Sequence, residues 1–300
     1  MPQEKTEATG PRLFCFGLGY SAGVLSRRLM AKGWTVAGTA RSEPRLREIA
    51  ALGAEAYPFD RDRPLDDPRA ALAGTTHILS SVPPDESGDP VLDHHGADIA
   101  ALGGLVWAGY LCTTGVYGDR GGEWVDESAE PRPSSARGRR RVAGERAWME
   151  LKDRADTPVH IFRLAGIYGP GRSAVDQVKA GTARRIDKPG QVFSRIHVED
   201  IANVLEASMA RPNPGAVYNV CDDEPAPAEQ VTAYAAELLG LEPPPLVPID
   251  QAELSPMARS FYADNRRVSN RRIREELGVE LFFPTYREGL RAIADESNGD

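Results

Sequence analysis

The stretch "FCFGLGYSAG", residues 14–23, decides the fold class. An apolar run is followed by Gly17, Gly19 and Ala22, which give the spacing G-x-G-x-x-A. At a turn from a strand into a helix, the first glycine permits the tight turn, and the second lets backbone amides approach a pyrophosphate. The alanine keeps the helix close to the strand. The alternative is an ordinary tight turn. The residues predicted to bind a dinucleotide here are Gly17, Gly19, Tyr20, Ser21 and Ala22.

Strand-length apolar runs then alternate with helical stretches along the chain. The runs are "RLFCFGL", "WTVAGT", "AEAYPFD", "THILSSV", "LVWAGYLCTT", "VHIFRLAGIYG" and "GAVYNV", and the clearest helices between them cover residues 137–152 and 198–209. This alternation is typical of a parallel sheet covered on both faces. We therefore predict an α/β protein with a Rossmann-type doubly wound parallel sheet and a smaller C-terminal substrate lobe.

The pattern changes after residue 222, where proline-rich segments separate short helices, and it is also interrupted at residues 171–194. These changes suggest an appended lobe. The expected organisation is a flexible tail at 1–11, a Rossmann domain at 12–170 completed by 195–222, and a substrate-binding lobe made of 171–194 and 223–300, which we expect to form a lid over the sheet.

The composition excludes some partners. The chain has 44 acidic against 36 basic residues and a net charge of -8, so the concentrated positive field that nucleic acid requires is absent outside residues 137–141. Three widely spaced cysteines in apolar surroundings indicate a reducing compartment. No apolar window has the length of a membrane span, and no signal peptide is recognisable. We expect a cytoplasmic protein that acts on a small molecule, as a monomer or a homodimer.

The end of the second predicted strand bears on the choice of cofactor. An NAD-binding protein usually carries an acidic residue there, which binds the ribose 2′-hydroxyl. Here the strand ends with Thr39 and Ala40, and Arg41 follows. An arginine suits a 2′-phosphate, so we predict NADP, with NAD as the alternative. The alternative for Arg41 is an arginine that faces solvent at the end of a strand and binds no cofactor. We also include Asp60, near the adenine or else a turn aspartate, and Ser81 among the cofactor-binding residues.

Together these segments resemble the extended short-chain dehydrogenase/reductase superfamily, in particular its NAD-dependent epimerase/dehydratase branch. The resemblance is carried by the glycine turn and by "TTGVYG" (113–118), "RLAGIYGPG" (163–171), "RIHVEDIA" (195–202) and "LGVELFFPTYREGL" (277–290). It implies hydride chemistry at a carbonyl or alcohol, often of a nucleotide sugar, and it gives Thr113 the role of orienting the substrate oxygen.

The family also implies a tyrosine that transfers a proton and a lysine four residues later. At those positions this chain has Arg137 and Arg141, within "PSSARGRRRVAGE". Arginine has no neutral form near pH 7, so Arg137 cannot replace the tyrosine. We predict that Arg137 and Arg141 lie beside the nicotinamide ribose and that Arg139 and Arg140 face solvent; alternatively, all four lie in water. The Asp-Glu pair of the dehydratases is missing after Thr113, which disfavours dehydration.

Four further candidates remain. Tyr117 is a substitute proton donor or a structural residue. Arg172 and Arg195 are expected to bind an anionic substrate; for Arg172 the alternative is a charged helix flank. The pair His94-His95 lacks further metal ligands nearby, so we expect no metal site. The function that follows is an atypical NAD(P)-binding oxidoreductase or epimerase-like enzyme acting on a small anionic or nucleotide-sugar-like substrate. The alternative is a non-catalytic sensor of NADP(H).

Overall fold

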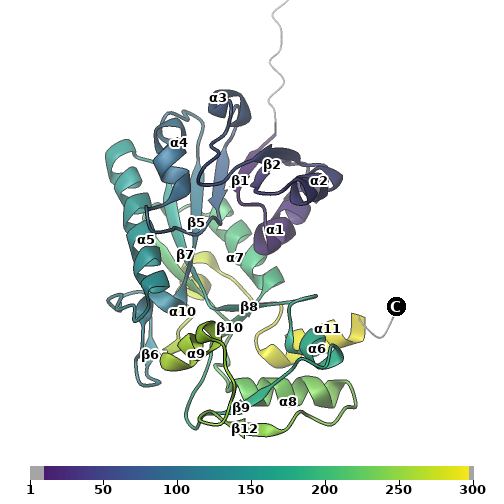
Figure 1. The fold of residues 1–300 in the computed structure, drawn as a ribbon. Coiled ribbons are helices and arrows are strands. Elements are labelled where there is room, and N and C mark those ends of the chain that lie inside the picture. Colours follow the sequence, from purple (N-terminus) through teal and green to yellow (C-terminus); the bar gives the residue numbers. More distant parts are fainter. Residues whose placement is uncertain (1–9, 297–300) are drawn as a thin grey trace, which may run out of the picture. The chain divides into compact units, whose positions relative to one another are not determined.

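The computed structural model describes residues 10–296, and Figure 1 shows their course. Most of the predicted tail, residues 1–9, lies outside the described residues. All seven predicted strands form one sheet. They are β1 (Arg12–Phe16), β2 (Thr35–Ala40), β3 (Glu55–Pro58), β4 (His77–Ser80), β5 (Trp107–Thr113), β7 (Val159–Leu164) and β11 (Val217–Val220).

The order of the strands in the sheet is β11-β7-β5-β4-β1-β2-β3. The pairs β1–β2, β1–β4, β2–β3 and β4–β5 are parallel. The chain moves outward from β1 to β3 and then returns to the other side of β1. The change of direction puts β1 at the switch point of the sheet, where open α/β sheets bind ligands beyond the carboxyl ends of their strands. The predicted Rossmann-type fold is confirmed.

The sequence of β1 is apolar without alternation because both of its faces are covered. Leu13, Phe14, Cys15 and Phe16 are all fully buried. On the next helix, α1 (Tyr20–Ala31), the buried positions Ala22, Leu25 and Leu29 recur at helical spacing. The apolar stripe therefore fixes α1 against the sheet and places its first residues directly after the glycine turn.

Two compact units make up the chain. The first comprises Met1–Leu111, Gly144–Ile161 and Pro212–Ala216, and the second comprises Cys112–Ala143, Phe162–Arg211 and Val217–Asp300. The sheet strands β5 and β7 and the long helix α5 (Ala136–Ala155) contribute residues to both. Besides α1, the first unit contains the helices α2 (Glu43–Ala51), α3 (Pro68–Ala71) and α4 (Pro90–Ala100).

The second unit holds the remaining elements. Its helices are η1 (Thr114–Tyr117), α6 (Ala174–Lys179), α7 (Val198–Ala210), α8 (Ala228–Leu238), α9 (Pro256–Ala263), α10 (Arg271–Leu277) and α11 (Tyr286–Glu296). Its short strands pair in twos: β6 (Trp124–Val125) with β13 (Arg267–Val268), β8 (Gly166–Tyr168) with β10 (Arg195–His197), and β9 (Arg185–Asp187) with β12 (Leu246–Pro248). Figure 1 shows β9 and β12 next to α8.

A separate apolar core lies within the second unit. Helices α6, α8 and α11 contribute Val175, Ala235, Leu290 and Ile293, all buried, to one cluster. The boundaries of the substrate lobe stay a prediction, but helix α6, from 171–194, packs against helices α8 and α11, from the C-terminal segment. Whether these segments act as a lid stays a prediction.

The second acidic residue of the motif "RIHVEDIA", Asp200, contacts the C-terminal segment. The Asp200 carboxylate is fully buried and accepts hydrogen bonds from the backbone amides of Phe282 at 2.7 Å and Phe283 at 3.0 Å. A buried carboxylate requires such donors. This contact ties α7 to the segment "LGVELFFPTYREGL".

Candidate functional site

The glycine turn after β1 is held by two hydroxyl side chains. Gly17 has a φ of +79°, which favours glycine, and its amide donates to Thr39 Oγ1 at 2.8 Å. The Ser81 hydroxyl donates to the Gly17 carbonyl oxygen. A Cβ at Gly17 would lie 2.8 Å from Ser81 Oγ. Ser81, predicted to touch the cofactor, therefore fixes the shape of the turn, and Thr39 has a role that the sequence did not reveal.

The N-terminus of α1 is open to an anion. Gly19 is its N-cap and makes no side-chain cap hydrogen bond, and the first turn contains no acidic residue. A Cβ built on Gly19 would meet no other atom within 4 Å, so there is room beside its backbone. Helix N-terminal amides and the helix dipole attract negative charge. The turn from Gly17 to Ala22 thus fits the pyrophosphate of a nicotinamide dinucleotide.

Two predicted cofactor contacts lie at the ends of β2 and β3. Arg41 is exposed, and its carbonyl oxygen accepts a hydrogen bond from the Arg63 guanidinium at 2.8 Å. Asp60 accepts from the Asp62 amide at 3.0 Å and forms an ion pair with Arg63 at 3.3 Å. These bonds within its own turn correspond to the turn aspartate that was the alternative for Asp60. A contact between Asp60 and adenine stays a prediction.

Within the second unit, Thr113 lies at the end of β5 and is half-buried. Its Oγ1 accepts a hydrogen bond from the Gly115 amide at 3.1 Å, which leaves the hydroxyl hydrogen available for another acceptor. The first turn of α5 lies against the same loop, since a Cβ on Gly138 would be 3.4 Å from the Gly115 carbonyl oxygen. The structure therefore brings the Thr113 loop next to the start of the arginine-rich helix.

The four arginines at the start of α5 differ in how exposed they are. Arg137 and Arg139 are exposed, whereas Arg140 and Arg141 are half-buried. Arg141 follows Gly138 by three residues and so shares its side of the helix, the side that faces the Thr113 loop. Arg140 is partly covered, and its predicted orientation toward solvent stays a prediction. The roles of Arg137 and Arg141 stay predictions.

Tyr117 lies in a closed polar cluster of the second unit. Its ring is fully buried, its hydroxyl donates to Asn219 Oδ1 at 2.7 Å, and the Arg163 Nη1 donates to that hydroxyl at 2.9 Å. The Arg163 guanidinium also lies 4.9 Å from the centre of the ring. Burial raises the pKa of Tyr117 to about 12, although Arg163 opposes this shift. This environment favours the structural alternative for Tyr117.

Arg172 and Arg195, the two residues predicted to bind the substrate, differ in exposure. Arg172 is exposed. Arg195 Nη1 donates to the carbonyl oxygens of Phe193 at 2.7 Å and Ala226 at 2.9 Å, and burial lowers the pKa of its guanidinium. Arg195 thus joins β10 to the residues before α8, an internal role that sequence reasoning missed.

His197 and the pair of adjacent histidines bond to the backbone. The Nδ1 of His197 accepts from the Glu199 amide at 3.3 Å, and burial lowers the pKa of its ring to about 4. His95 Nε2 accepts from the Leu65 amide at 3.1 Å, and His94 Nε2 lies 2.8 Å from the Arg61 carbonyl oxygen. Within residues 10–296, no group of three potential metal ligands is found.

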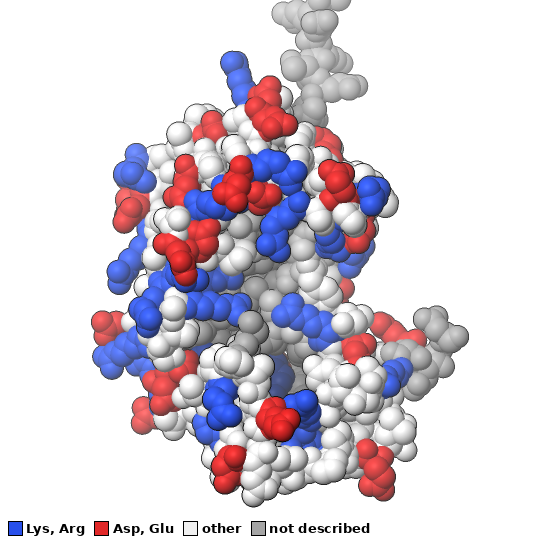
Figure 2. All heavy atoms as spheres, viewed as in Figure 1, with Lys and Arg blue, Asp and Glu red and all other residues white. Residues whose placement is uncertain are grey.

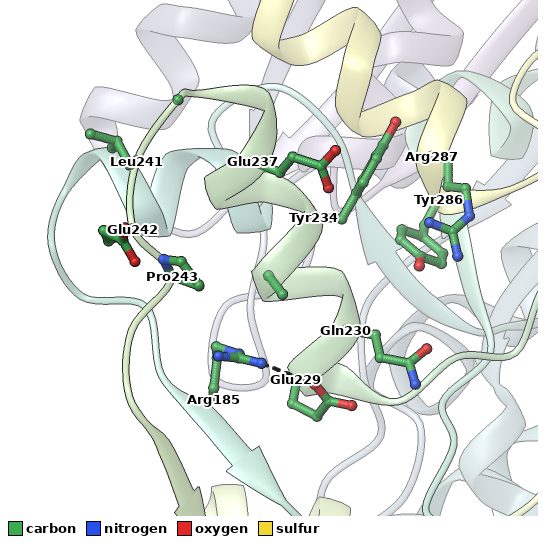
Figure 3. Close-up of a pocket in the computed structure, with 12 residues that line it drawn as sticks. Arg185, Glu229, Gln230, Tyr234, Glu237, Leu241, Glu242, Pro243, Tyr286 and Arg287 are labelled. Carbon is green, nitrogen blue, oxygen red and sulfur yellow. Dashed lines mark ion pairs between the residues drawn. The ribbon is translucent and has the colours of Figure 1, made fainter.

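A shallow groove of ≈ 720 Å³ runs along α8 in the second unit. Figure 3 shows Tyr234 and Glu237 on α8 facing it, with Tyr286 and Arg287 from α11 at one side. Arg185 forms an ion pair with Glu229 at 3.5 Å, which neutralises its charge. Arg185 belongs to the segment 171–194, in which the sequence predicts basic residues that bind an anionic substrate. The lining residues of the groove are Arg185, Glu229, Gln230, Ala233, Tyr234, Glu237, Gly240, Leu241, Glu242, Pro243, Tyr286 and Arg287.

Acidic and basic side chains are interspersed over much of the face drawn in Figure 2. Among the helices of residues 10–296, none has the length and apolar character needed to cross a membrane.

No family model matches the chain. Comparison with solved structures nevertheless identifies the fold. The structure of UDP-glucuronic acid 4-epimerase from Bacillus cereus, in complex with UDP-glucuronic acid and NAD, has a TM-score of 0.77 and 16% identity, covering 96% of this chain and 99% of that one. The chain therefore has the fold of an NAD-dependent epimerase, which is the fold that the resemblance seen in the sequence implied.

Two further proteins are similar to this chain over most of its length. A functionally unknown conserved protein from Silicibacter pomeroyi DSS has 54% identity and a TM-score of 0.88, covering 96% of this chain and 99% of that one. Protein YeeZ of Escherichia coli (strain K12) is 28% identical over 288 residues, which cover 89% of this chain and 94% of the relative. At 54% identity over nearly the whole length, this chain and the Silicibacter protein belong to one family.

Proposed function

We propose that the chain is an NAD(P)-dependent oxidoreductase or epimerase-like enzyme that acts on a small anionic substrate. The observation that carries this proposal is the Gly17–Gly19 turn, which leaves the N-terminus of α1 uncapped by any side chain and open beside Gly19. The complex of the Bacillus cereus epimerase, which has the same fold, supports a nicotinamide dinucleotide as the cofactor. When bound, such a cofactor donates or accepts a hydride.

In this proposal the chain's own residues bind the cofactor and orient the substrate. The α1 amides bind the pyrophosphate, and Thr39 and Ser81 keep the turn in the shape that exposes those amides. In the second unit, Thr113 orients a substrate oxygen, because its hydroxyl hydrogen is available while its oxygen is held by the Gly115 amide. Arg141, half-buried on the side of α5 that faces this loop, favours an anionic group.

The preferred cofactor is NADP. Arg41 is exposed after β2, where its guanidinium is free to move toward a 2′-phosphate, and β2 ends without an acidic residue. NAD is the alternative.

A second candidate function is a sensor that binds NADP(H) without turnover. It is favoured by the closed cluster around Tyr117 and by the arginines at the positions of the tyrosine and lysine. Neither arrangement provides a proton donor tuned to neutral pH.

Titration of the purified chain with NADPH and NADH, followed by nicotinamide fluorescence, tests the proposal. We expect saturable binding of NADPH. NADPH oxidation in the presence of carbonyl compounds that carry a carboxylate or phosphate would support the enzyme, and tight binding with no oxidation would support the sensor. If neither dinucleotide binds, both candidate functions are wrong.

A further inference from the structure

A second arginine, outside the arginine-rich helix, lies beside the Thr113 loop. Arg266 precedes β13 and is only 17% exposed at its side chain. Its Nη1 donates to the Gly118 carbonyl oxygen at 2.8 Å and lies 3.3 Å from the Asp264 carboxylate. Gly118 ends the η1 turn that begins after Thr113. Arg266 is therefore anchored to the loop that carries Thr113, although the two residues are far apart in the sequence.

The free end of this guanidinium borders a small space. The point that a Cβ on Gly115 would occupy lies 3.4 Å from Thr113 Oγ1 and 4.0 Å from Arg266 Nη2. Gly115 and Thr113 are both half-buried, so solvent reaches the space. The absence of a side chain at position 115 thus leaves room between a hydroxyl group and a guanidinium nitrogen.

The guanidinium of Arg266 forms hydrogen bonds through only one of its two terminal nitrogens among the described residues. Both of its hydrogen bonds to described residues, those of the range 10–296, use Nη1, and none of them uses Nη2. A mostly buried cation with an unused donor gains from an anionic acceptor. Because Nη1 is already engaged, Arg266 offers Nη2 to a further acceptor.

We propose that Arg266 Nη2 binds a carboxylate oxygen of the substrate in the space beside Gly115, next to the Thr113 hydroxyl. The inference rests on the proposed function in that Thr113 is taken to orient the same substrate. It makes Arg266 a determinant of specificity for small carboxylates and assigns Gly115 the role of keeping the space open.

The first test uses malonate as a probe, with the neutral malonamide and inorganic phosphate for comparison, in ligand-observed NMR titrations of the full chain. We expect malonate to bind and malonamide not to bind. Arg266→Gln should weaken malonate binding by about tenfold or more, as expected for the loss of a charge-assisted hydrogen bond. Arg271→Gln, at an arginine whose side chain is 74% exposed on α10, is the matched control and should bind malonate like the wild type.

Gly115→Ala is the second variant because it leaves Arg266 in place. Gly115 is not among the glycines with positive φ, so alanine fits its backbone, while the added methyl group occupies the proposed site. We expect weaker malonate binding with unchanged circular dichroism. If Arg266→Gln fails to fold, malonate binding to Gly115→Ala alone tests the inference. Wild-type affinity in Gly115→Ala and in folded Arg266→Gln would overturn the inference, as would binding of phosphate but not malonate to the wild type.

A parallel NADPH titration separates this inference from the proposed function. NADPH binding without malonate binding overturns the carboxylate site alone. Malonate binding without binding of either dinucleotide leaves the Arg266 site standing as an anion site and overturns the proposed cofactor.

Discussion

Thr39 Oγ1 accepts the amide hydrogen of Gly17 at 2.8 Å, so a side chain from the second strand fixes the turn that follows the first. The hydroxyl is buried, with Thr39 only 1% exposed. A buried amide that loses its acceptor destabilises the fold and frees the turn to move. The shape of the proposed pyrophosphate site therefore depends on a residue that does not belong to the glycine motif.

Thr39→Val tests this dependence. We expect a loss of about 1–2 kcal/mol in the free energy of unfolding, measured by denaturant titration, together with weaker NADPH binding. The control is Thr35→Val, the same change at an exposed position of the same strand. If both variants bind NADPH equally well, the Thr39 hydroxyl does not shape the cofactor site.

Gly19→Val should abolish dinucleotide binding, because a branched side chain would fill the space beside the first residues of α1. Nothing else lies within 4 Å of the position of that Cβ, so the melting temperature should change little. Gly103→Val, at an exposed glycine that also has no neighbour within 4 Å, is the matched control. An unchanged NADPH titration in Gly19→Val would refute the site.

Arg41→Ala should weaken NADPH binding by about tenfold or more and leave NADH binding nearly unchanged, because only NADPH carries the 2′-phosphate. Arg45→Ala, two residues into α2, removes an exposed charge nearby and serves as the control. The measurement is a pair of titrations for each variant. Equal losses for the two cofactors would show that Arg41 does not read the 2′-phosphate.

Tyr117→Phe should cost about 1–3 kcal/mol of unfolding free energy, because Asn219 Oδ1 and Arg163 Nη1 lose their partner. The pKa of Tyr117 is raised by burial from 10.0 to about 12, so its neutral form stabilises the fold. That contribution is complete below pH 10 and is lost as the pH rises toward about 12. Denaturant titrations across this range should show a shallower loss of stability in Tyr117→Phe. An equally steep loss in both proteins would contradict the shift.

The sheet could be predicted because each of its strands is an apolar run bounded by turns. The pairs of short strands in the second unit could not be predicted, because strands such as β6 and β13 have two residues each and lie far apart in the sequence. Periodicity within a few residues carries no information about such pairing.

The same limit applies to the candidate site. The glycine turn is a local pattern and was predicted with its residues. Arg266 was missed because its contact with Gly118 joins positions 148 residues apart. The closed environment of Tyr117 comes from Arg163 and Asn219, 46 and 102 residues away. A tyrosine in "GVYG" has the same local sequence whether its hydroxyl is enclosed or exposed.

The hydrogen bonds between Asp200 and the amides of residues 282 and 283 also determine when this part of the chain can finish folding during synthesis. The ribosome makes Asp200 82 and 83 residues before the two amides that satisfy its carboxylate. Until they emerge, α7 carries a charged group that belongs in the interior but has no interior partner, so it must stay hydrated. During synthesis from the N-terminus, this part of the second unit therefore completes its folding only after residues 282 and 283 have left the ribosome.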